Sequence, residues 1–373
     1  MAYAYSPGLK ILESTTVHRE RRLPIAGEVR VNIGDKVSAE EVVMNTHLPG
    51  KADIINIVSM LGCLPNEIEK YMLKKAGDFV EKGDLIAESS SFFGLFKTRI
   101  HAPLAGAIEA VSQVTGQVTM RGAPVPVEVK AYIDGEVSSA EEKQSVTIQT
   151  TGTFIQGIFG VGGETCGELA VAVSKPEEKL TPELITEDHK DKIVVGGSLV
   201  TIECINKAVE TGVKAIVAGG FNDADLNKLL GYDLGVAITG HEKIGLTLIV
   251  TEGFGEIPMA DKTFEILKNL NGKKASVNGA TQIRAGVIRP EIIVPHESAE
   301  AVDEEEAKLI LDIGTQIRAI REPYFGMLGK VTELPTELNK LPTESKARVL
   351  KVKFNNGEEA VIPRANVEVI ATS

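Results

Sequence analysis

Glycine-centred turns that recur along the first third of the chain constrain the fold more than any other feature of the sequence. Gly34, Gly77 and Gly83 are each followed by Asp and, two residues after that, by Val or Ile. A longer echo relates the stretches that begin at Pro24 and Pro103, which are 79 positions apart (24 and 103). Glycine supplies the positive φ of a tight turn, and the β-branched residue after it starts a strand. The pattern predicts a β-rich module built as an internal repeat.

These Gly-Asp turns resemble those of the barrel-sandwich hybrid family, which includes lipoyl and biotinyl carrier domains and related barrels that carry no cofactor. We place such a domain at residues 21–138, after an N-terminal extension at residues 1–20, with a helical insertion at residues 61–75. The resemblance implies a modified lysine only if one lies at a hairpin tip with carrier-type neighbours. Lys51 is the nearest candidate, and its neighbours match neither carrier motif. A non-carrier barrel is therefore expected, and modification of Lys51 stays open.

Residues 139–297 show a different pattern, in which short apolar runs alternate with segments of helical spacing. Apolar runs begin near Ile193, Lys214 and Gly245, and the stretches 200–212, 223–231 and 260–270 have the periodicity of helices. Strands interleaved with helices favour an α/β domain with a mainly parallel sheet. The segment 233–239 is expected to add another strand.

Three polar, glycine-rich turns follow predicted strands of this domain, where open α/β sheets bind ligands. A helix start at such a turn also favours an anion. Ser198 and Asp223 would serve equally well as helix caps with no ligand present. Two arginines in an apolar stretch could reach a phosphate or carboxylate, or could pair with carboxylates at a domain interface. The candidate ligand-binding residues are Gly196, Gly197, Ser198, Gly219, Gly220, Asn222, Asp223, Thr251, Glu252, Gly253, Arg284 and Arg289.

The densest glycine cluster, residues 157–167, matches neither a phosphate-binding loop of the Gly-Lys-Ser type nor a dinucleotide fingerprint. Close backbone packing is the expected reason for these glycines. Cys166 lies in the cluster, and no neighbouring His supports a role as nucleophile. The six His and three Cys are scattered without the spacing of a metal site, so we expect no metal and leave the cofactor unknown.

The C-terminal segment, residues 311–373, combines a Gly-x-x-Gly-x-Val core at Gly326 with an Asn356-Gly357 turn between alternating strands. It resembles the KOW motif of SH3-like barrels and follows an acidic linker at residues 298–310. KOW modules contact RNA or protein, which implies a contact surface. The candidate partner-binding residues are Arg318, Arg321, Lys330 and Arg364. The same residues could be solvated charges on a barrel that packs against the rest of the chain.

Composition limits the classes of function. The net charge of −12 argues against a protein that binds nucleic acid over its whole surface, since that affinity comes from neutralising phosphates. We find no signal peptide and no apolar run of membrane-spanning length, and the few cysteines fit a reducing cytoplasm.

The expected fold class is multi-domain α/β plus all-β, with a barrel-sandwich hybrid, a central glycine-rich α/β layer and a C-terminal SH3-like barrel. The function favoured is a non-catalytic intracellular binding or assembly protein with a protein partner or self-assembly, and a phosphate-containing small molecule could bind the α/β domain. One alternative is a nucleotide- or phosphometabolite-binding enzyme or electron-transfer subunit, and another is a transcription- or ribosome-associated factor that meets nucleic acid through the C-terminal domain. Whether any reaction is catalysed stays open.

Overall fold

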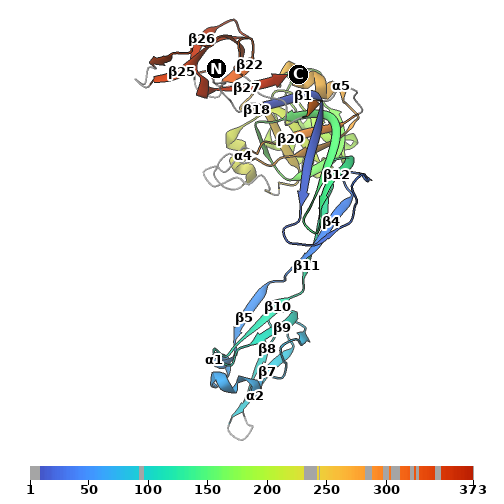
Figure 1. Ribbon diagram of the computed structural model, residues 1–373, viewed down its shortest axis with the longest axis vertical. Helices are drawn as coiled ribbons and strands as arrows, with labels where there is room; N and C mark the ends of the chain where they lie inside the picture. The colour runs from blue at the N-terminus through green and yellow to red at the C-terminus, as the bar shows by residue number, and fades with distance from the viewer. Residues whose placement is uncertain are drawn as a thin grey trace.

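The computed structural model describes residues 9–91, 96–230, 242, 244–281, 288–296, 302–303, 311–319, 323–324, 327–340 and 346–372. Strands dominate, and helices are few and short. Figure 1 shows an elongated molecule with a C-terminal unit at one end, a central body next to it and a separate lobe at the far end. The expected strand at 233–239 lies outside the described residues.

The central body is a mixed sheet whose pairings close into a ring. Its strands are β13 (Ser145–Gln156), β14 (Phe159–Val161), β15 (Glu164–Val171), β16 (Ile193–Val195), β17 (Ala215–Phe221), β18 (Thr247–Phe254), β19 (Lys274–Asn278) and β20 (Glu291–Pro295). The pairing runs β14-β18-β17-β16-β15-β19-β20-β13. It closes because β13 leads into β14 after only two residues. The largest hydrophobic core of the described residues fills this body.

Fewer strands of the body pair in parallel than we expected. Only β15 to β18 pair in parallel, whereas β14, β19 and β20 are antiparallel to their neighbours. The helices of the body are α3 (Ile202–Thr211), α4 (Asp223–Leu230) and α5 (Asp261–Asn269), with single turns of 3₁₀ helix η2 (Pro182–Leu184) and η3 (Glu187–His189). In α3, Thr201 caps the start by accepting the Cys204 N–H, and Gly212 ends the helix with a φ of +85°. The predicted helices of the body are therefore confirmed.

The first described strand, β1 (Leu9–Arg22), pairs with strands of both the body and the C-terminal unit. It pairs antiparallel with β13 from Ile11 to Arg22. On its other edge it pairs in parallel with the last strand of the chain and with the short β21 (Val302–Asp303). Residues that we assigned to an N-terminal extension therefore run through the middle of the fold.

The span that we assigned to one barrel contains two hydrophobic cores. The residues of one core are inserted, in sequence, between the residues of the other. The proximal lobe, residues 23–48 and 125–144, holds β2 (Glu28–Val29), β3 (Lys36–Val37), β4 (Val42–Leu48), β11 (Val125–Lys130) and β12 (Gly135–Glu141), and its core includes residues of β1 and β13. The distal lobe, residues 51–122, has a core of its own. It holds β5 (Ala52–Asn56), α1 (Ile57–Leu61), η1 (Pro65–Glu67), α2 (Ile68–Tyr71), β6 (Phe79–Val80), β7 (Leu85–Ser91), β8 (Phe96–His101), β9 (Gly106–Val111) and β10 (Gln117–Gly122). The inserted helix expected at 61–75 is instead α1, η1 and α2.

The two lobes share the Gly-Asp turns that we predicted. Gly34 and Gly77 have φ of +91° and +93°, and the Asp after each accepts a 2.7 Å hydrogen bond from a backbone N–H three residues before it. Asp84 repeats this turn at 3.0 Å. Gly34 N–H donates to Val137 O, as Gly77 N–H donates to Ile108 O. Gly83 N–H donates to Ala102 O in the same way, so the three Gly-Asp turns have one geometry.

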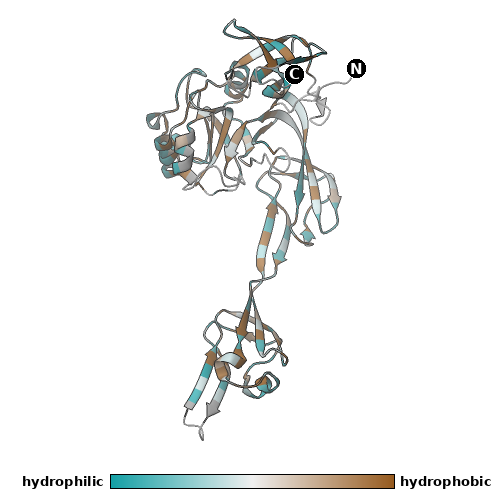
Figure 2. Ribbon diagram, turned by 90° about the vertical axis from the view of Figure 1, so that its left-hand side faces the viewer, coloured by the Kyte–Doolittle hydropathy of each residue, from teal (hydrophilic) through white to brown (hydrophobic). Residues whose placement is uncertain are grey.

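A narrow neck joins the lobes (Figure 2). The ladder of β4 and β11 ends at the pair Leu48 and Val125, and Gly122 N–H then donates to Lys51 O at 2.9 Å. A Cβ on Gly50 would collide with Gly122 O, so glycine is required where these two segments of the chain cross. Lys51 lies at this crossing and not at a hairpin tip.

The C-terminal unit has a separate core and continues the sheet of the body. Its elements are β22 (Gln316–Ala319), β23 (Leu328–Glu333), β24 (Leu338–Lys340), β25 (Lys346–Phe354), β26 (Glu359–Pro363), η4 (Arg364–Asn366) and β27 (Val367–Thr372). The hairpin predicted at Asn356-Gly357 is confirmed, since β25 and β26 pair around it. β27 pairs with β22 on one edge and with β1 on the other. No helix in the described part of the chain has the length and hydrophobicity to cross a membrane.

Candidate functional site

The three glycine-rich turns that we predicted to bind a ligand do meet at one end of the parallel strands. Gly219 N–H donates to Gly197 O at 2.7 Å, and Val200 N–H donates to Gly220 O at 3.1 Å. Thr251 Oγ1 donates to Ala218 O at 3.4 Å. The carboxyl ends of β16, β17 and β18 therefore lie together, as parallel pairing requires.

The space at these turns is filled by the chain itself. A Cβ on Gly197 would collide with Glu178 O, and one on Gly220 would collide with Gly255 O. Ser198 is 1% exposed, and its hydroxyl donates to Glu177 O at 2.7 Å. The segments around 176–180 and 255–259 thus occupy the crevice where a ligand would sit. The candidate ligand-binding residues that the structure describes line none of its three best-defined cavities.

Glu252 belongs to a buried ion network that joins the body to the C-terminal unit. Arg318 is 1% exposed and donates from Nη1 to Glu252 O at 2.7 Å and to Glu252 Oε2 at 3.2 Å. Its Nη2 donates to Glu368 Oε2 at 2.8 Å, and Arg289 binds the other oxygen of Glu368. Burial lowers the pKa of Arg289, and the charge of Glu368 opposes that shift. Arg289 and Arg318 are therefore engaged inside the protein.

The other predicted residues fall in several places. Asn222 is half-buried and accepts the Asp225 N–H where α4 begins, and Gly253 has a φ of +151° at the end of β18. Asp223 is the first residue of α4. Arg364 donates to Val349 O and Pro335 O, so it faces its own barrel, whereas Lys330 is exposed on β23. Arg284 and Arg321 lie outside the described residues.

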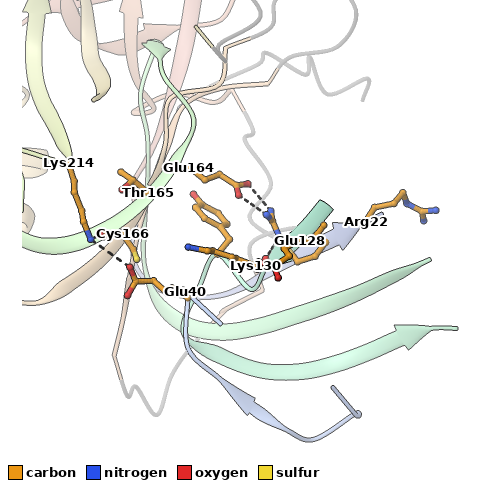
Figure 3. Close-up of a pocket in the computed structure, with 12 residues that line it drawn as sticks. Arg22, Glu40, Glu128, Lys130, Glu164, Thr165, Cys166 and Lys214 are labelled. Atoms are coloured by element: carbon orange, nitrogen blue, oxygen red, sulfur yellow. Dashed lines mark hydrogen bonds and ion pairs between the residues drawn. The ribbon is translucent and has the colours of Figure 1, made fainter. Parts of the chain in front are cut away.

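A cavity of about 510 Å³ lies elsewhere, at the junction of the proximal lobe and the body (Figure 3). Its walls come from the ends of β1 and β11, the turn before β4, the start of β15 and the residue before β17. It is lined by Arg21, Arg22, Ala39, Glu40, Glu128, Val129, Lys130, Tyr132, Glu164, Thr165, Cys166 and Lys214. A more open hollow of about 870 Å³ runs beside β12, where the His296 ring already bonds Glu13 O and Thr153 Oγ1.

Tyr132 forms a fixed wall of this junction cavity. It is 4% exposed and has a φ of +73°, a left-handed conformation that costs a non-glycine residue about 1 kcal/mol or more. Its hydroxyl donates to Glu291 Oε1 at 3.0 Å, and Arg19 holds both oxygens of Glu291. Burial raises the pKa of Tyr132 well above its ordinary value, and the nearby Glu291 adds to the effect. Strained residues of this kind cluster at binding sites, which makes the cavity the leading candidate site.

Arg21 is a second fixed side chain of the cavity wall, next to Tyr132. Its two terminal nitrogens donate to the two oxygens of Glu164 at 2.7 and 2.6 Å, and its Nε donates to Lys130 O at 2.9 Å. The guanidinium also lies over the Tyr132 ring, 5.4 Å from the centroid. Arg21 and Glu164 neutralise each other, so they shape the cavity and leave its net charge to other residues.

Cys166, Glu40, Lys130 and Lys214 point toward one another along one part of the cavity lining (Figure 3). Lys214 Nζ donates to Cys166 O at 2.9 Å and lies 3.7 Å from Glu40 Oε1. Burial raises the pKa of the Cys166 thiol, and Glu40 raises it further. A protonated thiol is a poor nucleophile, so this environment gives no support to the nucleophile that we considered.

Sequence reasoning singled out Cys166 but missed Arg21, Tyr132, Lys130 and Lys214. These residues come from separate segments and share no spacing, so no local pattern could have grouped them. Within the described residues, no cluster of three His, Cys, Asp or Glu side chains could hold a metal ion.

No protein-family model matches the sequence, and no curated protein shows significant similarity to it.

Proposed function

We propose that the chain is a non-catalytic binding or assembly protein that presents its distal lobe to a macromolecular partner. The observation that carries this proposal is the separation of the lobe. Among the residues that the structure describes, it has its own hydrophobic core and meets the rest of the chain through the neck at Gly50 and Gly122. A unit held in this way is positioned to reach a partner without disturbing the body.

The surface of the distal lobe supports this proposal. Six of the fifteen large hydrophobic side chains that are exposed among the described residues lie in it, although residues 51–122 are less than a quarter of the chain. Concentrated apolar exposure is typical of interaction surfaces. The six residues are Ile54, Met60, Leu64, Leu73, Phe79 and Val114.

Three of these residues come from segments that contact one another. Met60 is in α1, Leu64 precedes η1, and Val114 is in the turn between β9 and β10. That turn packs on α1, since Val58 N–H donates to Gly116 O at 3.2 Å, and Gln113 donates to Glu69 in α2 at 2.6 Å. We take Met60, Leu64 and Val114 as the centre of the docking surface.

Family resemblance supports a docking role in general terms. The three Gly-Asp turns have one geometry, which fits the barrel-sandwich reading of both lobes. The order of β22, β23, β25, β26 and β27, with one 3₁₀ turn before the last strand, fits an SH3-like barrel of KOW type. The three unpaired thiols fit a reducing compartment, and we propose the cytoplasm.

Met60→Glu and Leu64→Glu test the proposal most simply. Both residues are exposed, so the free energy of unfolding should change by no more than about 0.5 kcal/mol, while a charge in the docking surface should abolish co-purification of the partner. Val361→Glu, at a similarly exposed valine of the C-terminal unit, is the control and should retain the partner. Retention by all three variants would show that the surface lies elsewhere, and a strict monomer without partners would refute the assembly reading.

The two alternatives fare differently. We expected a phosphate or nucleotide site at the glycine-rich turns, but these turns pack against backbone. A small-molecule role would therefore have to use the junction cavity instead. The nucleic-acid reading keeps Lys330 as an exposed cation, but Arg318 and Arg364 are engaged inside the protein. The nucleic-acid reading would be favoured if the protein binds RNA in a salt-sensitive way and Lys330→Ala weakens that binding.

A further inference from the structure

The junction cavity has the dimensions of a site for a small organic molecule. A volume of about 510 Å³ falls within the range of roughly 300–1,000 Å³ that is usual for such sites. An inorganic phosphate ion would leave most of it unfilled. The position between two separately cored parts of the chain is also where ligand sites concentrate.

Two exposed charged side chains of the lining, Lys130 and Glu128, have no hydrogen bond or ion pair within the described part of the chain. Arg21 and Glu164 form a bidentate pair, and Glu40 is shared with Lys214 at 3.7 Å. Lys130 Nζ points toward Cys166 (Figure 3). A single negative charge on a ligand would therefore be balanced there.

Apolar surface lies beside this charge. Ala39 and Cys166 are 3% and 8% exposed, and Val129 and the Tyr132 ring complete the apolar lining. Cys166 behaves as a small hydrophobic group while its thiol is protonated, and burial raises its pKa in that direction. The cavity thus offers an apolar floor with a cation at one side.

Its walls are set before any ligand arrives. The Tyr132 ring is held by Glu291 and Arg19, and Arg21 is held by Glu164 and Lys130 O. Walls fixed by such contacts lower the ordering cost of binding.

We propose that the junction cavity binds a small organic acid with one negative charge, whose carboxylate pairs with Lys130 and Lys214 and whose apolar part lies on Ala39, Val129, Tyr132 and Cys166. This site is separate from the glycine-rich turns and does not depend on the docking role of the distal lobe. The class of ligand follows from the size, charge and lining of the cavity.

Alkylation of the full-length chain with iodoacetamide tests this site, because Cys166 lies in the cavity and Cys63 lies in the distal lobe. Hexanoate or benzoate at saturating concentration should slow modification of Cys166 about tenfold and leave Cys63 unchanged, as peptide mass spectrometry would show. Lys130→Met should raise the hexanoate concentration needed for protection by about tenfold or more, since it removes a charged contact. It leaves the backbone oxygen that accepts Arg21 in place. Lys330→Met, on the exposed face of β23, is the matched control and should protect like the native chain.

Equal protection by hexan-1-ol and hexanoate would overturn the assignment of an acid. Failure of every acid tested to protect Cys166 would overturn the site. If Cys166 proves too slow to alkylate in the unliganded protein, calorimetric titration of hexanoate into the native chain and the Lys130→Met variant decides the same question. Binding heat in the native chain, with weaker binding in the Lys130→Met variant, supports the proposal. No binding heat in the native chain contradicts it.

Discussion

The distal lobe and the C-terminal unit stand at opposite ends of the molecule and are attached to it in opposite ways. The C-terminal unit shares a strand edge with β1 and buries Arg318 between Glu252 and Glu368. The distal lobe crosses to the rest of the chain where Gly50 packs on Gly122. The first arrangement couples a unit to the body, and the second leaves it to behave independently. Under the function that we propose, a unit of this chain serves in docking only where its attachment leaves its surface available.

The buried ion network should show the strongest coupling. We expect Arg318→Met to cost about 3–5 kcal/mol of unfolding free energy, because Glu252 and Glu368 would remain buried without their partner. Denaturation in urea would measure it. Lys330→Met, an exposed substitution on the neighbouring strand β23, should cost less than about 0.5 kcal/mol. A similar small cost for both would mean that the C-terminal unit is as loosely attached as the distal lobe.

Equivalent core substitutions in the two lobes should sharpen the contrast. Val37 and Val80 occupy matching positions after their Gly-Asp turns and are 6% and 1% exposed. Changing either to Ala should cost about 2 kcal/mol, from the lost methyl groups and the cavity left behind. Hydrogen exchange should confine the effect of Val80→Ala to residues 51–122 but spread that of Val37→Ala into the body. Spread in both variants would contradict the independence of the distal lobe.

The matching turns provide a smaller test of what the two lobes share. Asp35 and Asp78 accept 2.7 Å hydrogen bonds from Asn32 N–H and Lys75 N–H. Replacement of either Asp by Ala should cost about 1 kcal/mol in its own lobe, because one turn hydrogen bond is lost. Thermal denaturation followed separately for each lobe would measure both. Unequal costs would show that the two turns are not equivalent.

The smallest effect that we expect concerns pH. Hydrogen bonds from Lys97 and then Arg99 lower the pKa of Glu88, which joins β7 to β8 in the distal lobe. A lowered folded-state pKa means that this carboxylate stabilises the lobe above about pH 5 and ceases to do so as the pH falls through the folded-state value. Glu88→Gln should remove that part of the acid sensitivity of the distal lobe, and salt should weaken it in the native chain. An unchanged pH profile would show that the exposed pairs contribute nothing measurable.

Local signals predicted much of the fold. The apolar runs near Ile193 and Lys214, the helical stretch 200–212 and the Asn356-Gly357 hairpin all depend on residues close together in sequence, and they are found where the pattern placed them. The nested arrangement of the two lobes was not predicted. It depends on β4 and β11 pairing across the whole distal lobe, a contact between positions far apart in the chain.

The candidate site was harder to predict, for the same reason. Gly197 and Gly220 allow another group to approach the backbone closely. The sequence could not say whether that group would be a ligand or the backbone of residues 178 and 255. Arg289 was identified as unusual in its apolar surroundings and Arg318 as a candidate partner-binding residue, while their carboxylate partners became evident only in three dimensions. The junction cavity draws on five separate segments, so it has no signature in the sequence.

The most direct measurement removes the distal lobe and asks what the protein still binds. Because Leu48 and Val125 are the last pair before the neck, an Asn-Gly turn can replace residues 49–124 and close β4 and β11 as a hairpin. Native mass spectrometry would then compare the full chain and this variant, each isolated gently from its own source. We predict that the full chain carries a protein partner or a second copy, and that the shortened chain is folded but lacks it. A shortened chain that keeps the same assembly would contradict the assignment of the distal lobe as the docking module.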